Sequence, residues 1–314
     1  SVWADVWKGN IEAPQKQTIG GKEYYVIEKA AHLAWFSDSV NKYVLNAKWQ
    51  RMISLIEADT SKPEYRTRAF KDSAIALMTA IRQDPESYYQ DPAKKALWNK
   101  GPYTGYLRSA WDFTTDVEMN ATITAEYLDM NNIPFTPIAA GNGTAKYTGT
   151  FLGNGITIKN LKVDSKEFPL QVFDVVHGYP SYCQNVGLFG VIGSGTVRNL
   201  ILDGVTIYAT GKNDYWANPH QVSVGPIVGW MTGGTIDTCY TSGKIVTNGR
   251  DVGAGGILGA MTNGKKISNA LSTVSIEASG RDVYVGGISG VIRGSVTISS
   301  SVYDGDNLEA HPDE

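Results

Sequence analysis

TVRNLILD, residues 196–203, is the stretch that decides the fold, because four further segments share its pattern. These segments read TIKNLKVD from Thr157, TIDTCYTS from Thr235, KISNALST from Lys266 and TISSSVYD from Thr297. The second residue of each segment is apolar and β-branched: Ile158, Val197, Ile236, Ile267 and Ile298. These residues follow one another at steps of 39, 39, 31 and 31 residues, and a recurring step of this length indicates a repeat architecture.

A second, glycine-containing marker precedes each of the last four segments. It reads VGLFG from Val186, VGPIVG from Val224, GGILG from Gly255 and VGGISG from Val285. Its closing glycines are Gly190, Gly229, Gly259 and Gly290. They are 39, 30 and 31 residues apart, so two separate markers keep nearly the same step.

Within each repeat, short apolar or β-branched runs alternate with glycine turns such as Gly233-Gly234, which predicts strands rather than helices. One repeat cannot bury its own apolar side chains, whereas stacked repeats bury them in a continuous core. A step near 31 residues is short for a propeller blade and irregular for a sandwich. The expected fold is therefore mainly β, a parallel β-helix (β-solenoid).

The stretches YTGTFLGNGITIKNLKVD from Tyr147 and VGLFG–VIG–GTVRNLIL from Val186 resemble the GLUG-motif repeats of bacterial surface proteins. The upstream stretches YYVIEKAAHLAWFSDSVN from Tyr24 and NATITAEYLDMNNIPFTPIA from Asn120 are similar to the lead-in that such repeats carry. The resemblance covers about two-thirds of the chain. It implies a right-handed β-helix in a secreted or cell-surface bacterial protein, commonly part of a larger multidomain chain. Some immunoglobulin A peptidases carry these repeats, but none of His32, His177, His220 and His311 begins their zinc motif HExxH.

The chain divides into three predicted parts. Residues 1–116 form a lead-in with a helical insertion at about 42–110, residues 117–303 form the β-solenoid, and residues 304–314 form a polar tail or linker. A helix is expected over Lys29–Asn41, and apolar residues at helical spacing recur over 47–56 and 69–81. The insertion is expected to cap or flank the solenoid, and aromatic residues at its exit are candidates to line a groove: Trp98, Tyr103, Tyr106 and Trp111.

Composition excludes several classes of function. The net charge is −3 and no basic patch is present, which argues against nucleic acid as a partner. No apolar run has the length of a transmembrane segment. Cys183 and Cys239 could pair in an oxidising compartment or remain isolated thiols, and the histidines show no metal-ligand spacing. Asp304, Asp306 and Asn307 lack the complete ligand set of a calcium loop, so no cofactor is predicted.

The candidate site is a loop face. The first two repeats are longer than the last two, and their extra residues fall in Ser165–Gln184 and Lys212–Gln221. Equivalent loops of stacked repeats gather on one face, which is often the binding face. Phe168, Phe173 and Cys183 are assigned to packing within the loops. The candidate ligand-binding residues are His177, Tyr179, Tyr182, Tyr215, Trp216, His220, Arg250, Arg281 and Tyr284.

Aromatic rings beside charged and amide groups suit a sugar chain, and the same mixture suits a protein interface. The first hypothesis is therefore a non-catalytic binding or adhesion module that recognises a glycan or a surface protein. The alternative is a polysaccharide-active β-helix enzyme (a lyase, hydrolase or esterase), with catalytic candidates Asp214, Asp251, Asp282 and Arg281. A third hypothesis is a structural stalk without a ligand.

Overall fold

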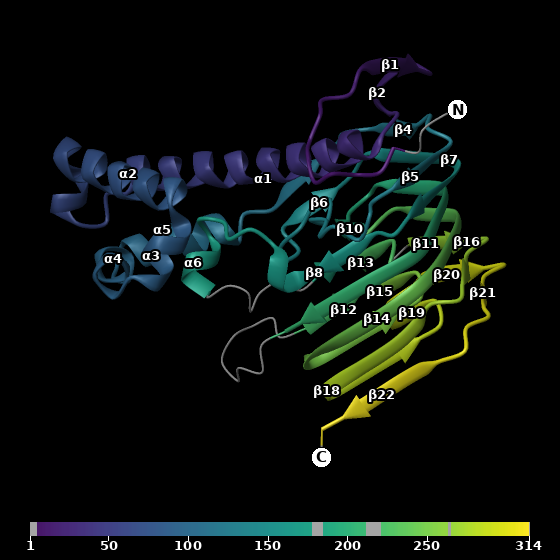
Figure 1. The fold of residues 1–314 in the computed structure, drawn as a ribbon. Helices are drawn as coiled ribbons and strands as arrows, with labels where there is room; N and C mark the ends of the chain where they lie inside the picture. Colours follow the sequence, from purple (N-terminus) through teal and green to yellow (C-terminus); the bar gives the residue numbers. More distant parts are fainter. Residues whose placement is uncertain (1–4, 178–184, 212–220, 263–264, 314) are drawn as a thin grey trace.

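The computed structural model describes residues 5–177, 185–211, 221–262 and 265–313, and it combines a helical N-terminal part with two sheets (Figure 1). The helices are α1 (Ala30–Ala58), α2 (Arg68–Gln83), α3 (Pro85–Gln90), α4 (Pro92–Trp98), α5 (Tyr103–Trp111) and α6 (Asp174–His177). Two short 3-10 helices, η1 and η2, span Pro63–Arg66 and Ser165–Glu167. None of the helices in the described part of the chain is long and apolar enough to cross a membrane.

The strands form a larger and a smaller sheet. The larger sheet has 16 strands: β1 (Lys16–Ile19), β2 (Lys22–Ile27), β4 (Ala121–Ile123), β5 (Tyr127–Asp129), β7 (Thr150–Lys159), β8 (Lys162–Asp164), β9 (Asn185–Val186), β11 (Thr196–Thr210), β12 (Gln221–Val224), β14 (Thr235–Gly255), β16 (Lys265–Ser268), β17 (Leu271–Ser272), β18 (Ser275–Gly286), β20 (Val296–Ser299), β21 (Val302–Tyr303) and β22 (Leu308–Pro312). The smaller sheet has six: β3 (Thr115–Val117), β6 (Ala145–Tyr147), β10 (Phe189–Ile192), β13 (Val228–Met231), β15 (Leu258–Thr262) and β19 (Ser289–Arg293). The hairpin β1–β2 is antiparallel, and the other strand pairs that join these elements are parallel.

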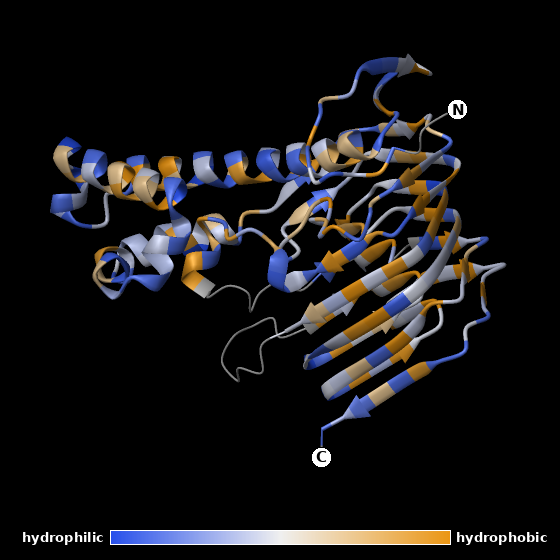
Figure 2. Cartoon of the chain, viewed as in Figure 1, coloured by the Kyte–Doolittle hydropathy of each residue, from blue (hydrophilic) through white to orange (hydrophobic). Residues whose placement is uncertain are grey.

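The predicted repeats are neighbours in the larger sheet. Val197 lies opposite Ile236, Ile236 opposite Ile267, and Ile267 opposite Ile298. The steps of 39, 31 and 31 residues are therefore confirmed as strand register. Along β11, β14 and β18, buried apolar residues alternate with more exposed ones, as the alternating colours in Figure 2 show.

The predicted alignment of the first repeat was wrong. Val197 pairs with Phe151, and Ile158 lies opposite Leu202. The register shifts between Arg198 and Leu200, where β7 carries the extra residues Asn154 and Gly155, both with positive φ. The bulge changes the offset between paired residues only from 46 to 44, so it does not account for the predicted offset of 39. The error lay in the choice of segment: Thr150–Leu152, and not the segment from Thr157, pairs with Thr196–Arg198.

The fourth residue of the repeat pattern occupies a left-handed corner. Asn199, Thr238, Asn269 and Ser300 have φ between 50° and 55°, a conformation that few residues other than glycine and asparagine adopt readily. The corner recurs once per repeat between two short strand segments. Asparagine suits this corner because it tolerates positive φ, although threonine and serine occupy it in two of the repeats.

The closing glycines of the second marker lie where two backbones meet. A Cβ on Gly229 would lie 2.4 Å from the Val186 backbone nitrogen, and one on Gly259 would lie 2.2 Å from that of Val224. At Gly190 and Gly290 the corresponding distances are 2.4 Å to the Ala139 carbonyl oxygen and 2.4 Å to the Ala254 nitrogen. Glycine is thus required at this position because a side chain has no space.

Helix α1 joins the two parts of the molecule. Its first half, including Phe36 and Val40, is buried in the same core as the sheets, and Figure 1 shows it lying across the end formed by β2 and β4. Its second half contributes Met52 and Ile56 to a separate helical core. One helix thus replaces the two helical segments that were predicted over 29–41 and 47–56. A hydrogen bond of 2.5 Å from the Ser37 hydroxyl to the Thr136 carbonyl fixes its first half to the loop before β6 of the smaller sheet.

The helical core also contains the aromatic residues that were predicted to line a groove. Trp98, Tyr106 and Trp111 are buried there, and the Tyr106 hydroxyl donates to Asp59 Oδ2 over 2.5 Å. The groove prediction was therefore wrong for Trp98 and Tyr106, whereas Trp111 lines a small cavity of about 30 Å³. Pro85 and Pro92 stand in the first turn of α3 and α4, where a missing N–H costs nothing.

The predicted polar tail after Tyr303 contains a strand. β22 pairs in parallel with β18, so that Leu308 lies opposite Ile276 and Ala310 opposite Ala278. The sequence prediction missed this strand because only two apolar residues alternate along it, next to charged ones. The Asp304–Asn307 segment, considered for calcium, is the connection between β21 and β22.

Gly229→Ala is expected to lower the free energy of unfolding by about 1–3 kcal/mol, because the new methyl group must displace backbone rather than a flexible side chain. The matched control is Gly105→Ala in α5, where a Cβ meets nothing within 4 Å. That change is expected to raise the stability by up to ~1 kcal/mol. Urea denaturation of both variants measures the difference, and equal stability of the two would contradict the packing argument.

Candidate functional site

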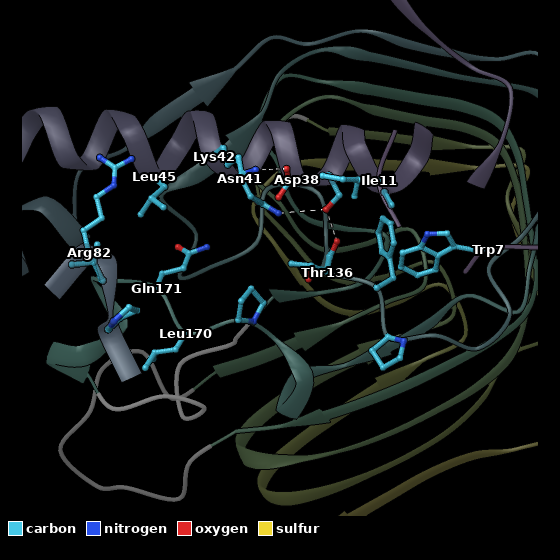
Figure 3. A pocket seen from close by; sticks show the side chains of 17 residues that line it. Trp7, Ile11, Asp38, Asn41, Lys42, Leu45, Arg82, Thr136, Leu170 and Gln171 are labelled. Atoms are coloured by element: carbon cyan, nitrogen blue, oxygen red, sulfur yellow. Dashed lines mark hydrogen bonds and ion pairs between the residues drawn. The ribbon is translucent and has the colours of Figure 1, made fainter. Parts of the chain in front are cut away.

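A cleft of about 340 Å³ lies between the helical part and the sheets (Figure 3). Its walls come from four places: the N-terminal segment, α1, the loop Pro134–Thr136 and the segment Pro169–Val172, with Arg82 and Pro85 at one end. A volume of this size falls in the range of ligand pockets, which occur preferentially where two structural units meet.

The walls of the cleft are mainly apolar. Trp7 and Phe135 form one end, where their rings meet edge to face with centroids 6.2 Å apart. Trp7 is held by a hydrogen bond from its indole nitrogen to the Asn10 carbonyl (2.8 Å). Leu45 and Leu170 line the other end (Figure 3). The ends of the cleft are therefore set by packing and hydrogen bonds within the protein.

The polar groups of the cleft lie along α1 and at the end with Arg82. Asn41 donates to the Pro137 carbonyl (2.9 Å) and accepts from the Ala140 backbone nitrogen (3.0 Å), so it fixes the loop to the helix. Lys42 forms an ion pair with Asp38 one turn earlier (2.8 Å). Arg82 donates to the Asn46 side chain, and its guanidinium lies 5.0 Å from the ring centroid of Trp49.

A buried lysine adjoins the cleft. Lys48 Nζ donates to the carbonyls of Trp111 (2.6 Å) and Phe113 (2.9 Å) and to the Thr144 hydroxyl (2.7 Å). These acceptors use the three donors of the ammonium group and tie α1 to the start of the smaller sheet. Burial lowers the pKa of Lys48 to about 8, and the negative charges of Asp112 and Asp174 only partly oppose this shift.

Asp174, the first residue of α6, lines the same small cavity as Lys48, which has a volume of about 30 Å³. Desolvation raises the pKa of its carboxyl to about 7, although the Gln171 backbone N–H donates to it (3.0 Å) and Lys48 lies nearby. Phe173 and Val175, on either side, are buried in the helical core. The acid is thus held in place by its apolar neighbours, and sequence spacing gave no sign of its partnership with Lys48.

The described part of the predicted loop face is a ladder of charged residues on β14 and β18. Asp251 lies opposite Asp282, and Gly253 lies opposite Tyr284. Arg281 joins the two carboxylates, with its Nη2 3.1 Å from Asp251 Oδ1 and 2.6 Å from Asp282 Oδ2. Tyr284 is 55% exposed, and Arg250 is partly buried.

These residues enclose a hollow of about 230 Å³. It is lined by Asp251, Val252, Arg281, Asp282, Tyr284, Val291 and Arg293. The hydrogen bond from Arg281 is the main reason that the pKa of Asp282 lies below its usual value. Asp282 therefore stays ionised at neutral pH, which suits ion pairing and hydrogen-bond acceptance rather than proton donation.

Most of the predicted aromatic residues lie outside the described residues: Tyr179, Tyr182, Tyr215, Trp216 and His220. The catalytic candidate Asp214 also lies outside them. His177 ends α6, and the structure describes its backbone alone. Phe168 and Phe173 are buried, so their assignment to packing is confirmed. Cys183 also lies outside the described residues, and Cys239 is a free, buried thiol whose pKa burial raises to about 12.

Within the described residues, one group of side chains could share a cation. The ligand atoms of Glu277, Glu309 and His311 lie within 4.8 Å of one another on β18 and β22. His311 Nε2 is 3.0 Å from Glu309 Oε2, so these two side chains already contact each other. The group is on the surface, and sequence spacing did not bring it to notice because its members come from two strands.

Comparison with known proteins gives partial matches. No protein-family model matches this chain. Over 151 residues, or 48% of the chain, it is 34% identical to halomucin from Haloquadratum walsbyi, and the match spans 1% of halomucin. Among solved structures, it resembles a candidate immunoglobulin A1 protease from Bacteroides ovatus, with 18% identity and a TM-score of 0.38 over 65% of each chain.

Asp174 gives the protein a specific pH dependence. Its folded-state pKa of about 7 lies above the ordinary value, so its contribution to stability is complete below about pH 4 and is lost as the pH rises through 7. The free energy of unfolding of the wild type, relative to Asp174→Asn, is expected to fall by roughly 2–4 kcal/mol between about pH 4 and pH 8. Urea denaturation at several pH values measures this difference.

The control is Asp116→Asn, which removes an exposed carboxylate on β3 and is measured over the same pH range. Parallel pH profiles for the wild type and Asp174→Asn would show that Asp174 titrates alike in the folded and unfolded chains, contrary to this account.

Proposed function

We propose that this chain is a non-catalytic binding module of a secreted or cell-surface protein, and that it recognises a glycan or a surface protein through its loop face. In this proposal the parallel strands form a right-handed β-helix of GLUG-type repeats, as the sequence resemblance implies. The register of one repeat against the next supports a stacked arrangement. The bacterial origin, like the handedness, rests on the resemblance.

The observation that carries the proposal is the ladder of Asp251, Arg281, Asp282 and Tyr284 around one hollow. An exposed tyrosine ring offers a flat apolar surface for the CH groups of a sugar or for a partner side chain. The neighbouring guanidinium and carboxylates offer donors and acceptors for hydroxyl groups. Tyrosine and arginine are also the residues enriched at the centres of protein interfaces.

The ion pairs that both carboxylates form with Arg281 favour binding over catalysis at this face. Both Asp251 and Asp282 are engaged by Arg281. A glycosidase needs one carboxylic acid with a raised pKa beside a second carboxylate, and the pKa of Asp282 is lowered. A purely structural stalk would not need an exposed tyrosine beside this charged hollow, although it would tolerate one.

The comparison with halomucin supports one further part of the proposal. A match of 151 residues to 1% of that protein is what a module within a much longer chain would give. We infer that the present chain is likewise a module of a larger multidomain protein. This inference concerns the architecture, and it assigns no ligand to the chain.

The test is a screen of glycans and polysaccharides for binding, run beside a reducing-sugar assay with the same substrates. Saturable binding without sugar release is expected. The double variant Arg281→Gln with Tyr284→Ala is expected to weaken binding at least ten-fold, because it removes the donors and the ring together. Its melting temperature is expected to fall slightly, because the loss of Arg281 leaves Asp251 and Asp282 opposite each other, so binding is compared at a temperature where both proteins are folded.

The matched control is Arg68→Gln, which changes an exposed arginine that pairs with Glu57 and Asp72 in the helical part. It is expected to bind like the wild type. Unchanged binding in the double variant would exclude the ladder as the site, and sugar release by the wild type would replace the binding proposal with the enzyme alternative.

A further inference from the structure

The cleft between α1 and the sheets is a second site, distinct from the loop face. Its lining is mainly apolar and includes Trp7, Phe135, Leu45 and Leu170. The ladder around Arg281 shares no lining residue with it. A ligand in the cleft would therefore be selected by different chemistry from a ligand of the loop face.

The apolar walls determine the size and polarity of the main part of the ligand. Ala34 and Ser37 are the small residues of α1 that face the cleft, and their size leaves space between the helix and the loop Pro134–Thr136. Three prolines, Pro85, Pro134 and Pro169, contribute further apolar surface. A cavity of about 340 Å³ with these walls fits a compact aromatic or aliphatic group better than a hydrated sugar.

The charged side chains of the lining determine which charge the polar group of the ligand carries. The charged lining side chains are Asp38, Lys42 and Arg82, so the cleft carries one net positive charge. Asp38 and Lys42 neutralise each other in their 2.8 Å ion pair. Arg82 contacts the Asn46 amide and the Trp49 ring, which are both neutral groups. A monoanionic group near Arg82 would balance the remaining charge.

We propose that this cleft binds a small amphipathic anion, with its apolar body between Trp7 and Leu170 and its anionic group at Arg82. Figure 3 shows the two ends of the site in this arrangement, with Trp7 and Ile11 at one end and Arg82 with Leu45 at the other. The side chains of Asn41 and Ser37 are committed to the loop Thr136–Ala140, so they hold the walls rather than the ligand.

Two fluorescent probes with nearly the same apolar body test the proposal. 8-Anilinonaphthalene-1-sulfonate carries an anionic group, and N-phenyl-1-naphthylamine is its neutral counterpart. Both are expected to bind the wild type with a saturable fluorescence increase. Arg82→Gln is expected to weaken binding of the anionic probe about five-fold and to leave the neutral probe unchanged.

Two further variants fill the cleft from opposite walls. Leu45→Trp and Leu170→Trp, both at partly exposed positions, are each expected to abolish binding of both probes. Melting temperatures close to that of the wild type identify the variants that are folded, and Arg66→Gln, an exposed arginine of η1, is the charge control.

Three outcomes would overturn the proposal. Absence of binding to the wild type excludes the cleft as a ligand site. Undiminished binding of both probes in folded Leu45→Trp and Leu170→Trp places them elsewhere on the surface. An equal effect of Arg82→Gln on the two probes, or no effect on either, removes the assignment of the anionic group. None of these results depends on whether the loop face binds a glycan.

Discussion

The column of apolar side chains that runs through Phe151, Val197, Ile236 and Ile267 is the constraint on which the rest of the structure depends. Each of the four is completely buried, and each is covered by its equivalent in the next repeat. A single repeat could not bury such a side chain, so the repeats stabilise one another by parallel register. The closing glycines and left-handed corners serve this packing in different ways. The glycines allow backbones to approach closely, and the corners let the chain turn.

The helical part is connected to the stacked repeats through α1, which contributes to both hydrophobic cores. The first half of this helix completes the apolar core at the end of the sheets, and Lys48 in its second half links it to the carbonyls that precede β3. The chain returns to the helices once more, when Phe173 and Val175 enter the helical core. The cleft and the partly buried Asp174 lie where these segments meet, so both depend on the contact between the helical part and the sheets.

The repeats were predictable from the sequence because strand register preserves their step. The closing glycines were equally visible, since close backbone approach restricts those positions. The first register was predicted wrongly because the segment from Thr157 matches TVRN in sequence, whereas the segment from Thr150 pairs with it in the sheet. The cleft was missed because its lining comes from segments far apart in the sequence, from Trp7 to Val172, and the proximity of Lys48 to Asp174 was missed for the same reason. Of the predicted loop face, sequence spacing correctly placed Asp251 beside Asp282.

The register itself is best tested by cross-linking two outward positions. Val246 and Glu277 are Cα partners on β14 and β18, at a spacing of about 4.8 Å that suits a disulfide. In a Cys183→Ser background, Val246→Cys with Glu277→Cys should form a disulfide readily. Val246→Cys with Ser279→Cys, shifted by two residues, should not. Rapid cross-linking of the shifted pair, or of neither pair, would contradict the stacked register from which this account is built.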